Sequence, residues 1–193
     1  MQATTADVTE SIVRILDTSP YSLAVDVGGA DGALLHSLMQ RNTQLRGIVL
    51  DRPDVAPAAC AAAETRGVSD RAVAIAGDFF EAVPAGDLYL LRFILHDWPD
   101  ARAIRILQNC RQAMKQNARV LVIEAFLPEV GEGVPSTMSD TQVTLIDLHM
   151  MVAQDGRERS LSEYDALFGK ADLRRVRTIS LDTGYVVIEA VAA

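Results

Sequence analysis

The stretch "LAVDVGGADGALLHSLMQRNTQLRGIVLD", residues 23–51, holds the pattern from which the fold can be predicted. It begins and ends in short apolar runs rich in Val, Ile and Leu, as expected for strands that are buried on both faces. Between these runs lie a glycine-rich turn and a segment with Leu34, Leu35 and Leu38 at helical spacing. A strand, a crossover helix and a second buried strand predict one unit of a parallel sheet.

The same alternation continues along the chain. Further apolar runs fall at residues 72–78, 87–94 and 118–126, and helical spacing falls at residues 58–64 and 104–114. The last part, "RRVRTISLDTGYVVIEAVA", holds two strand-like runs around an Asp-Thr-Gly turn, which predicts a hairpin. The sequence therefore predicts an α/β, Rossmann-like fold with a mostly parallel seven-stranded sheet, a C-terminal antiparallel hairpin and helices on both faces.

Composition limits the domain count and the partners. The chain has 193 residues, of which 49% are hydrophobic, and this length suits one domain. A net charge of -8 argues against nucleic acid, because phosphate binding needs a basic face. No apolar run has the length of a membrane span, so we expect a cytoplasmic protein with a small-molecule partner. Cys60 and Cys110 have no paired or metal-type spacing and are expected to fill the core.

The glycine-rich turn "VDVGGADG" leaves alternatives open. A nicotinamide fingerprint that starts at Gly28 requires two further glycines, but Ala30 and Ala33 stand there, so an oxidoreductase is disfavoured. The pattern acid-x-G-x-G-x-G matches at Asp26, Gly28 and Gly32 and fails at Ala30. A tight turn without a ligand is the other alternative.

Acidic residues stand near the ends of the next two predicted strands. Asp51 ends the second strand, where a carboxylate can accept hydrogen bonds from both hydroxyls of a ribose. "GDFF" follows the third strand and brings Asp78 and Phe79 to the same edge. A carboxylate can bind the amino group of adenine and an aromatic ring can cover the base, so we expect a nucleotide-type ligand beyond the strand ends.

A histidine stands at the end of the fourth predicted strand. In "LLRFILHDWPD" the apolar run stops at His96, which is followed by an acid and by the only tryptophan of the chain. An imidazole has an ordinary pKa of about 6.5, which suits proton transfer at neutral pH. A strand end would direct the His96 side chain toward the ligand.

Five stretches together form a wider pattern: "VDVGGADGALL", "GIVLDRPDV", "GDFFEAVPAGDLYLLRFILHDWPD", "NARVLVIEAFLP" and "GRERSLSEYDALF". In order and spacing they resemble the S-adenosylmethionine-dependent O-methyltransferases of the caffeic acid and isoflavone type and their bacterial relatives in natural-product biosynthesis. The resemblance extends from about Leu23 to Ala190. It implies a class I methyltransferase fold, S-adenosyl-L-methionine as cofactor, S-adenosyl-L-homocysteine as product, an aromatic hydroxyl as methyl acceptor, and no metal.

The resemblance also implies three catalytic residues. His96 would be the general base that removes the proton of the acceptor hydroxyl, with Glu124 and Glu158 on either side of it. The residues themselves allow other interpretations. Glu124 could be a strand acid bound by backbone donors, and Glu158 could be a loop residue paired with Arg157 or Arg159.

The same resemblance implies the remaining site residues. Met150 and Met151 would hold the aromatic acceptor, although methionines on the core side of a helix are an equal alternative. Two positions depart from the plant enzymes, since Arg92 replaces a lysine and Ala30 replaces a glycine. The cofactor would be bound by Gly28, Asp51, Asp78, Phe79 and Arg92.

The domain organisation departs from the family. Family members carry an N-terminal, mainly helical domain that forms the dimer and part of the acceptor pocket. The resemblance implies that residues 1–193 are the cofactor-binding catalytic domain without this part, so a homodimer is a weaker expectation. The alternative to an active enzyme is a cofactor-binding module that is non-catalytic or depends on a partner chain.

Overall fold

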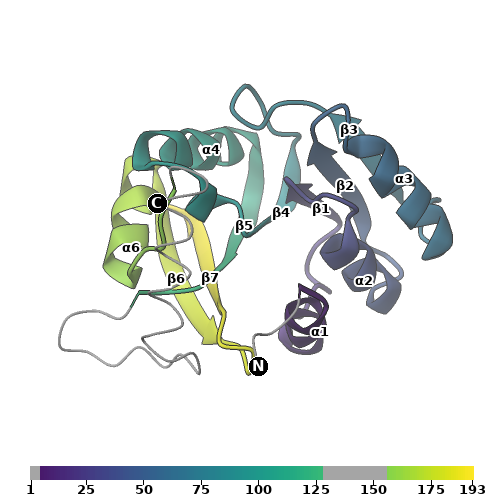
Figure 1. The fold of residues 1–193 in the computed structure, drawn as a ribbon, viewed down its shortest axis with the longest axis horizontal. Helices are drawn as coiled ribbons and strands as arrows, with labels where there is room; N and C mark the ends of the chain where they lie inside the picture. Colours follow the sequence, from purple (N-terminus) through teal and green to yellow (C-terminus); the bar gives the residue numbers. More distant parts are fainter. Residues whose placement is uncertain (1–4, 128–155) are drawn as a thin grey trace.

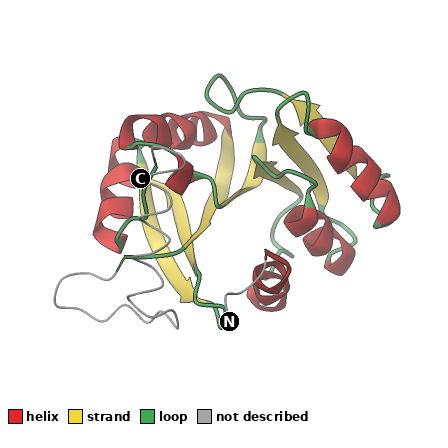
Figure 2. Cartoon of the chain, in the orientation of Figure 1, coloured by secondary structure: helices red, strands yellow, loops and turns green. Residues whose placement is uncertain are grey.

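The computed structural model describes residues 5–127 and 156–193. Helices and strands follow one another along these residues, with β3 followed directly by β4 and β6 followed directly by β7 (Figure 2). Within them, no helix combines the length and the apolar character needed to cross a bilayer. The elements are α1 (Thr5–Ile15), β1 (Leu23–Val27), α2 (Ala33–Arg41), β2 (Arg46–Asp51), α3 (Ala56–Thr65), β3 (Ala72–Ala76), β4 (Gly86–Arg92), the 3-10 turn η1 (Leu95–Asp97), α4 (Asp100–Ala113), β5 (Met114–Glu124), α6 (Leu161–Lys170), β6 (Leu173–Ser180) and β7 (Val186–Ala192).

The strands form one sheet in the order β3-β2-β1-β4-β5-β7-β6. The first five strands in this order run parallel to one another, whereas β7 is antiparallel to both β5 and β6. The predicted seven-stranded sheet with its C-terminal hairpin is confirmed, and the hairpin inserts β7 between β5 and the edge strand β6. The strand order reverses between β1 and β4, and ligands of such sheets bind beyond the carboxyl ends of the strands at this point.

Two hydrophobic cores cover the two faces of the sheet. Helices α4 and α6 pack on one face, and α1, α2 and α3 pack on the other (Figure 1). In β4, Tyr89 and Leu91 belong to the first core, while Leu88 and Leu90 belong to the second. Successive side chains of a strand point to opposite faces, so a strand covered on both sides needs an apolar residue at every position. This is why the central strands are continuous apolar runs in the sequence.

The edge strand β3 departs from that pattern. Ala72 and Ala74 pack against the core that contains α3. On the other face of the strand Val73 is 54% exposed and Ile75 is 36% exposed. The prediction that every parallel strand is buried on both faces is wrong for β3, because this strand lies at the edge of the sheet, beyond the cover of α4 and α6.

The two cysteines have different surroundings. Cys110 of α4 lies in the core, as predicted. Cys60 of α3 is exposed, so the prediction that it fills the core is wrong. The helix places Cys60 on its outer side, because its inward positions are taken by Ala56, Ala59 and Ala63, about one turn apart.

Candidate active site

The glycine loop, residues 28–32, follows β1 at the carboxyl edge of the sheet. Gly28, Ala30 and Gly32 all have left-handed backbone conformations, with φ of 70°, 52° and 72°. The amide of Gly28 donates to the carbonyl of Leu50 at 2.8 Å, and the amide of Ala30 donates to Oδ2 of Asp51 at 2.8 Å. The loop is thus turned back onto the end of β2, and Ala30 adopts a conformation that costs an alanine about 1–2 kcal/mol relative to the right-handed one.

Phe79 and Ile94 lie against the glycine loop. A Cβ atom added to Gly28 would lie 2.5 Å from Cδ1 of Ile94 and 3.4 Å from Cε1 of Phe79. Any side chain at residue 28 would therefore collide with Ile94. Phe79 is a predicted cofactor residue and Ile94 begins the loop that carries His96, so the two halves of the predicted site are neighbours.

The predicted cofactor acids Asp51 and Asp78 both bind backbone amides of the loops around them. Besides the bond to Ala30, Asp51 accepts at Oδ1 from its neighbouring amide at 2.8 Å. Oδ1 of Asp78 accepts from the amide of Phe80 at 2.8 Å. The structure places Asp51 and Phe79 beside the glycine loop, and Asp78 next to Phe79 in the loop that follows β3, where Asp78 is exposed and Phe79 is half-buried.

Arg92, the last residue of β4, is anchored on α1. Its Nη1 donates to Oγ1 of Thr9 at 2.5 Å. Burial raises the pKa of Asp26 to about 6, and the charge of Arg92 opposes this rise. Asp26 is only 2% exposed, and its Oδ2 has no hydrogen-bond partner among the described residues.

Glu124 holds the backbone of residues 94–98, which we call the His96 turn. The carboxylate is fully buried at the end of β5, and its Oε1 accepts from the amides of Ile94 at 3.1 Å and Leu95 at 3.0 Å. Its Oε2 lies 3.4 Å from Nδ1 of His96. Glu124 therefore binds backbone donors and also faces the imidazole, and its catalytic role stays a prediction.

Glu158 faces the same ring nitrogen at closer range. It is fully buried, and its Oε1 lies 2.8 Å from Nδ1 of His96. The neighbouring arginines Arg157 and Arg159 both form ion pairs with Asp100, at 3.2 and 3.0 Å. The structure thus brings together the three predicted catalytic residues from β5, the His96 turn and the segment before α6.

The charges of this cluster favour a protonated imidazole. Burial lowers the pKa of His96, but the facing carboxylates of Glu124 and Glu158 outweigh burial and raise it to about 9. Burial also raises the pKa of Glu124, and the charge of His96 opposes this rise. The two carboxylates therefore favour the charged form of the imidazole.

The cluster is suited to proton transfer. A proton on Nδ1 of His96 would be donated to Glu158, which leaves Nε2 as the acceptor once the ring is neutral. Nε2 lies 3.5 Å from Oδ1 of Asp97, a residue whose pKa is raised by burial. One atom each of His96, Glu124 and Glu158 lies within 4.8 Å of the others, so the set could also hold a metal ion. The expectation that no metal takes part stays a prediction.

An aromatic cluster beside the His96 turn was not predicted. The rings of Phe80 and Trp98 have centroids 4.8 Å apart, and Phe79 lies 6.2 Å from Trp98. The guanidinium of Arg102 lies 4.5 Å from both the Phe80 and the Trp98 centroids. The cluster joins the loop after β3 to the His96 turn. The single tryptophan, two residues after the histidine, was the feature of the sequence that could have indicated it. The predicted acceptor residues, Met150 and Met151, lie outside the described residues.

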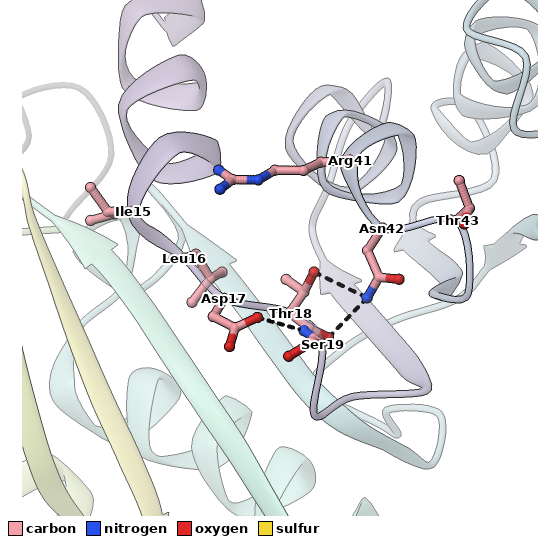
Figure 3. Close-up of a pocket in the computed structure, with 8 residues that line it drawn as sticks. All are labelled: Ile15, Leu16, Asp17, Thr18, Ser19, Arg41, Asn42 and Thr43. Carbon is pink, nitrogen blue, oxygen red and sulfur yellow. Dashed lines mark hydrogen bonds between the residues drawn. The ribbon is translucent and has the colours of Figure 1, made fainter.

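A pocket of about 370 Å³ lies elsewhere in the molecule (Figure 3). Its residues precede β1 and β2, so it lies at the amino edge of the parallel strands, opposite to the cluster around His96. Hydrogen bonds from Asn42 to Thr18 and from the amide of Ser19 to Asp17 hold its wall. None of the predicted site residues lines it. The lining residues are Ile15, Leu16, Asp17, Thr18, Ser19, Arg41, Asn42 and Thr43.

Comparison with protein families and curated relatives shows one consistent similarity. Residues 1–174 match the family model described as the O-methyltransferase domain. The chain is 37% identical over 187 residues to the phenazine O-methyltransferase PhzM of Lysobacter antibioticus, covering 96% of this chain and 53% of that protein. It is 41% identical over 177 residues to the O-demethylpuromycin-O-methyltransferase of Streptomyces alboniger, covering 90% and 46%. The chain thus spans about half the length of the curated relatives it matches.

Solved structures show the same similarity. The mitomycin 7-O-methyltransferase MmcR superposes with a TM-score of 0.87 at 34% identity, over 96% of this chain and 53% of that chain. The O-methyltransferase NcsB1 from neocarzinostatin biosynthesis, in complex with S-adenosyl-L-homocysteine and 1,4-dihydroxy-2-naphthoic acid, superposes with a TM-score of 0.82 at 34% identity, over 94% and 52%.

Proposed function

The chain belongs to the O-methyltransferase domain family, and we propose that it transfers a methyl group from S-adenosylmethionine to a hydroxyl group of an aromatic small molecule. The observation that carries the proposal is the pairing of His96 with the fully buried Glu158 at 2.8 Å, on the turn whose Ile94 lies against Gly28. A histidine oriented by a buried carboxylate is the arrangement expected of a general base.

The described residues fit the cofactor. Asp51 lies at the carboxyl end of β2, where a carboxylate can bind ribose hydroxyls, and Phe79 offers an aromatic ring for the adenine. The unpartnered Oδ2 of Asp26 beneath the glycine loop fits a ligand with a positive charge or a donor nearby. We assign the cofactor to Gly28, Asp51, Asp78, Phe79 and Arg92. Bound S-adenosylmethionine supplies the methyl group on a positively charged sulfur.

His96 performs the proton transfer in this proposal. Neutral Nε2 accepts the proton of the acceptor hydroxyl, while the oxygen forms a bond to the methyl carbon and the carbon–sulfur bond breaks with its electron pair going to sulfur. Glu158 keeps the other proton on Nδ1 and stabilises the imidazolium that forms. Glu124 holds the backbone of the turn, so the ring stays in line with its target.

The relatives support a class of acceptor. Similar proteins include phenazine and mitomycin O-methyltransferases, and NcsB1 was solved in complex with a dihydroxynaphthoic acid. We therefore propose a fused aromatic acceptor with a free hydroxyl, bound in part by Met150 and Met151. Residues 1–193 would form the catalytic domain of such an enzyme, acting in the cytoplasm without nucleic acid or membrane.

The second candidate is a cofactor-binding module that is inactive alone. It is favoured by one observation, which is that the chain spans only about half of its relatives. An acceptor pocket shared with another chain would leave cofactor binding intact and abolish turnover.

Two measurements separate these candidates. Calorimetric titration of the chain with S-adenosylmethionine and S-adenosylhomocysteine should show saturable binding at one site. Transfer of a radiolabelled methyl group to 1,4-dihydroxy-2-naphthoic acid should then occur, and His96→Ala should lower it by about 100- to 10,000-fold with cofactor affinity retained. Binding without transfer would favour the inactive module, and an equally active His96→Ala variant would rule out His96 as the base.

A further inference from the structure

Arg159 is a buried cation within the fold. It is 0% exposed and is the largest of the fully buried side chains among the described residues. Burying a guanidinium is costly unless each donor finds an acceptor. Its neighbour in the sequence is Glu158, the carboxylate that faces His96.

The donors of Arg159 are directed at the His96 turn. Nη1 donates to the carbonyl of Leu95 at 2.9 Å, and Nη2 donates to the carbonyl of Trp98 at 2.7 Å. Nε and Nη2 also bind Oδ1 of Asp100 at 3.1 and 3.0 Å. Leu95 precedes His96 and Trp98 follows it by two residues, so the planar guanidinium spans the residue that carries the base.

The polar groups of the turn are divided between two buried charges. The amides on its N-terminal side donate to Glu124, and the carbonyls of Leu95 and Trp98 accept from Arg159. The carbonyl of His96 itself accepts from the backbone amide of Arg157 at 2.9 Å. An anion therefore holds one side of the turn and a cation holds the other.

The backbone of Arg159 is fixed as well. It forms a bridge with Phe126, and its carbonyl accepts from the amide of Leu127 at 3.1 Å. Gly156 lies so close to the turn that an added Cβ would overlap the carbonyl oxygen of His96. The side chain of Arg159 thus connects the turn to a segment that is anchored beyond β5, and this segment also carries Glu158.

We propose that Arg159 is a positioning residue for the methyl transfer, which sets the distance between His96 and Glu158 by holding the carbonyl side of the His96 turn. The inference rests on the proposed function, and it adds a residue that touches neither cofactor nor acceptor. Lysine cannot replace it fully, because one compact ammonium group cannot span two carbonyls and a carboxylate in the plane of the guanidinium.

A role in stability alone makes a different prediction. If Arg159 only supported the fold, its replacement would lower the free energy of unfolding and leave the titration of His96 and the turnover of the folded protein unchanged. If it sets the distance between His96 and Glu158, its replacement weakens that pair, so the pKa of His96 falls toward its ordinary value.

The test compares Arg159→Met and Arg159→Lys with a control, Arg175→Met, in the same chain. Arg175 forms a two-point ion pair with Asp165 at 2.7 and 2.6 Å on β6, far from the turn in the sheet. Side-chain NMR gives the titration of the histidines, and His96→Ala identifies the signal of His96 among the three in the chain. Calorimetry gives the affinity for S-adenosylhomocysteine, and methyl transfer to 1,4-dihydroxy-2-naphthoic acid gives kcat and KM.

We expect Arg159→Met to lower kcat by about 100-fold, because small displacements of a catalytic group have effects of this size, with the affinity for S-adenosylhomocysteine retained. The titration of His96 should move to lower pH, Arg159→Lys should be intermediate, and millimolar guanidinium should partly restore kcat of the Met variant. If Arg159→Met does not fold, Arg159→Lys decides by the same readouts.

Unchanged titration of His96 in the folded Arg159 variants, with kcat no lower than in Arg175→Met, would overturn the proposal. If the wild-type protein transfers no methyl group, the proposed function fails, but the titration of His96 still decides whether Arg159 sets its surroundings.

Discussion

Two loops at the carboxyl edge of the sheet, the His96 turn and the glycine loop, are held by different kinds of interaction. The His96 turn follows β4 and is bound by the buried side chains of Glu124 and Arg159. The glycine loop follows β1 and depends on left-handed backbone conformations at three of its residues. Its ion pair, Asp31 with Arg66 at 2.8 Å, is partly exposed, at 48% and 30% of the two side chains.

The difference shows which changes each loop tolerates. Removing one partner of a buried charged pair leaves an unsatisfied charge and costs several kcal/mol, whereas an exposed pair contributes about 1 kcal/mol or less. A left-handed glycine with close neighbours excludes any side chain, whatever its charge. The His96 turn should therefore be sensitive to charge, and the glycine loop to side-chain volume.

Glu124→Ala should have the largest effect on stability. It removes the acceptor of the amides of Ile94 and Leu95 and leaves them buried, so we expect a loss of about 3–5 kcal/mol in the free energy of unfolding. Denaturant unfolding at neutral pH measures the loss. Glu124→Gln retains an acceptor oxygen and should lose clearly less. Equal losses would show that the backbone amides do not depend on this oxygen.

The pH dependence of the free energy of unfolding tests the charges around His96 as a group. The folded pKa of His96 is raised to about 9, from about 6.5 in an unfolded chain. Its contribution to stability is fully present below pH 6.5 and is lost as the pH rises through 9, because the folded state binds the proton more tightly. The free energy of unfolding of the wild type should therefore fall between pH 6.5 and 9, on the order of a few kcal/mol. The fall should be smaller in His96→Ala. A parallel pH dependence in both proteins would contradict the raised pKa.

Gly28→Ala tests whether the glycine loop can accommodate a larger side chain. The new Cβ would lie 2.5 Å from Cδ1 of Ile94, and φ of 70° costs alanine about 1–2 kcal/mol. We expect weaker binding of S-adenosylhomocysteine, by about tenfold or more, as measured by calorimetry. Ile94→Val removes the colliding methyl group, so the double variant should regain part of the affinity. If the double variant regains no affinity, the loss comes from the backbone conformation alone.

Asp31→Asn should have the smallest effect. It removes the charge from the ion pair with Arg66, which is partly exposed on both sides. We expect the free energy of unfolding to fall by less than about 1 kcal/mol and the cofactor affinity to stay within a factor of two or so. A loss as large as that of Glu124→Ala would remove the contrast between the two loops.

Much of the fold could be predicted because local patterns of apolar residues indicate its strands and helices. The runs around β1, β2 and β4 are apolar at successive positions since each strand is covered on both faces. The same patterns could not show that β3 would be an edge strand with Val73 exposed, or that Cys60 would face outward. The exposure of Val73 depends on the position of β3 at the edge of the sheet, and the exposure of Cys60 depends on which face of α3 packs on the sheet.

The site could be predicted in part. His96 stood out by its place at a strand end, and the resemblance supplied Glu124 and Glu158. Arg159 was only an alternative partner for Glu158, because a charged residue in "GRER" has the composition of an exposed loop. Its burial follows from contacts with residues about 60 positions earlier, which no local pattern contains.

Apolar periodicity in the sequence predicted the order of strands and helices, the glycines predicted a tight turn after β1, and a motif of a few residues singled out His96 as the proposed base. The binding of opposite sides of the His96 turn by Glu124 and Arg159, by contrast, arises only in the folded chain. The physical reason is that a charge is tolerated in the interior only where partners from distant parts of the chain meet it, and that meeting exists only once the sheet has formed.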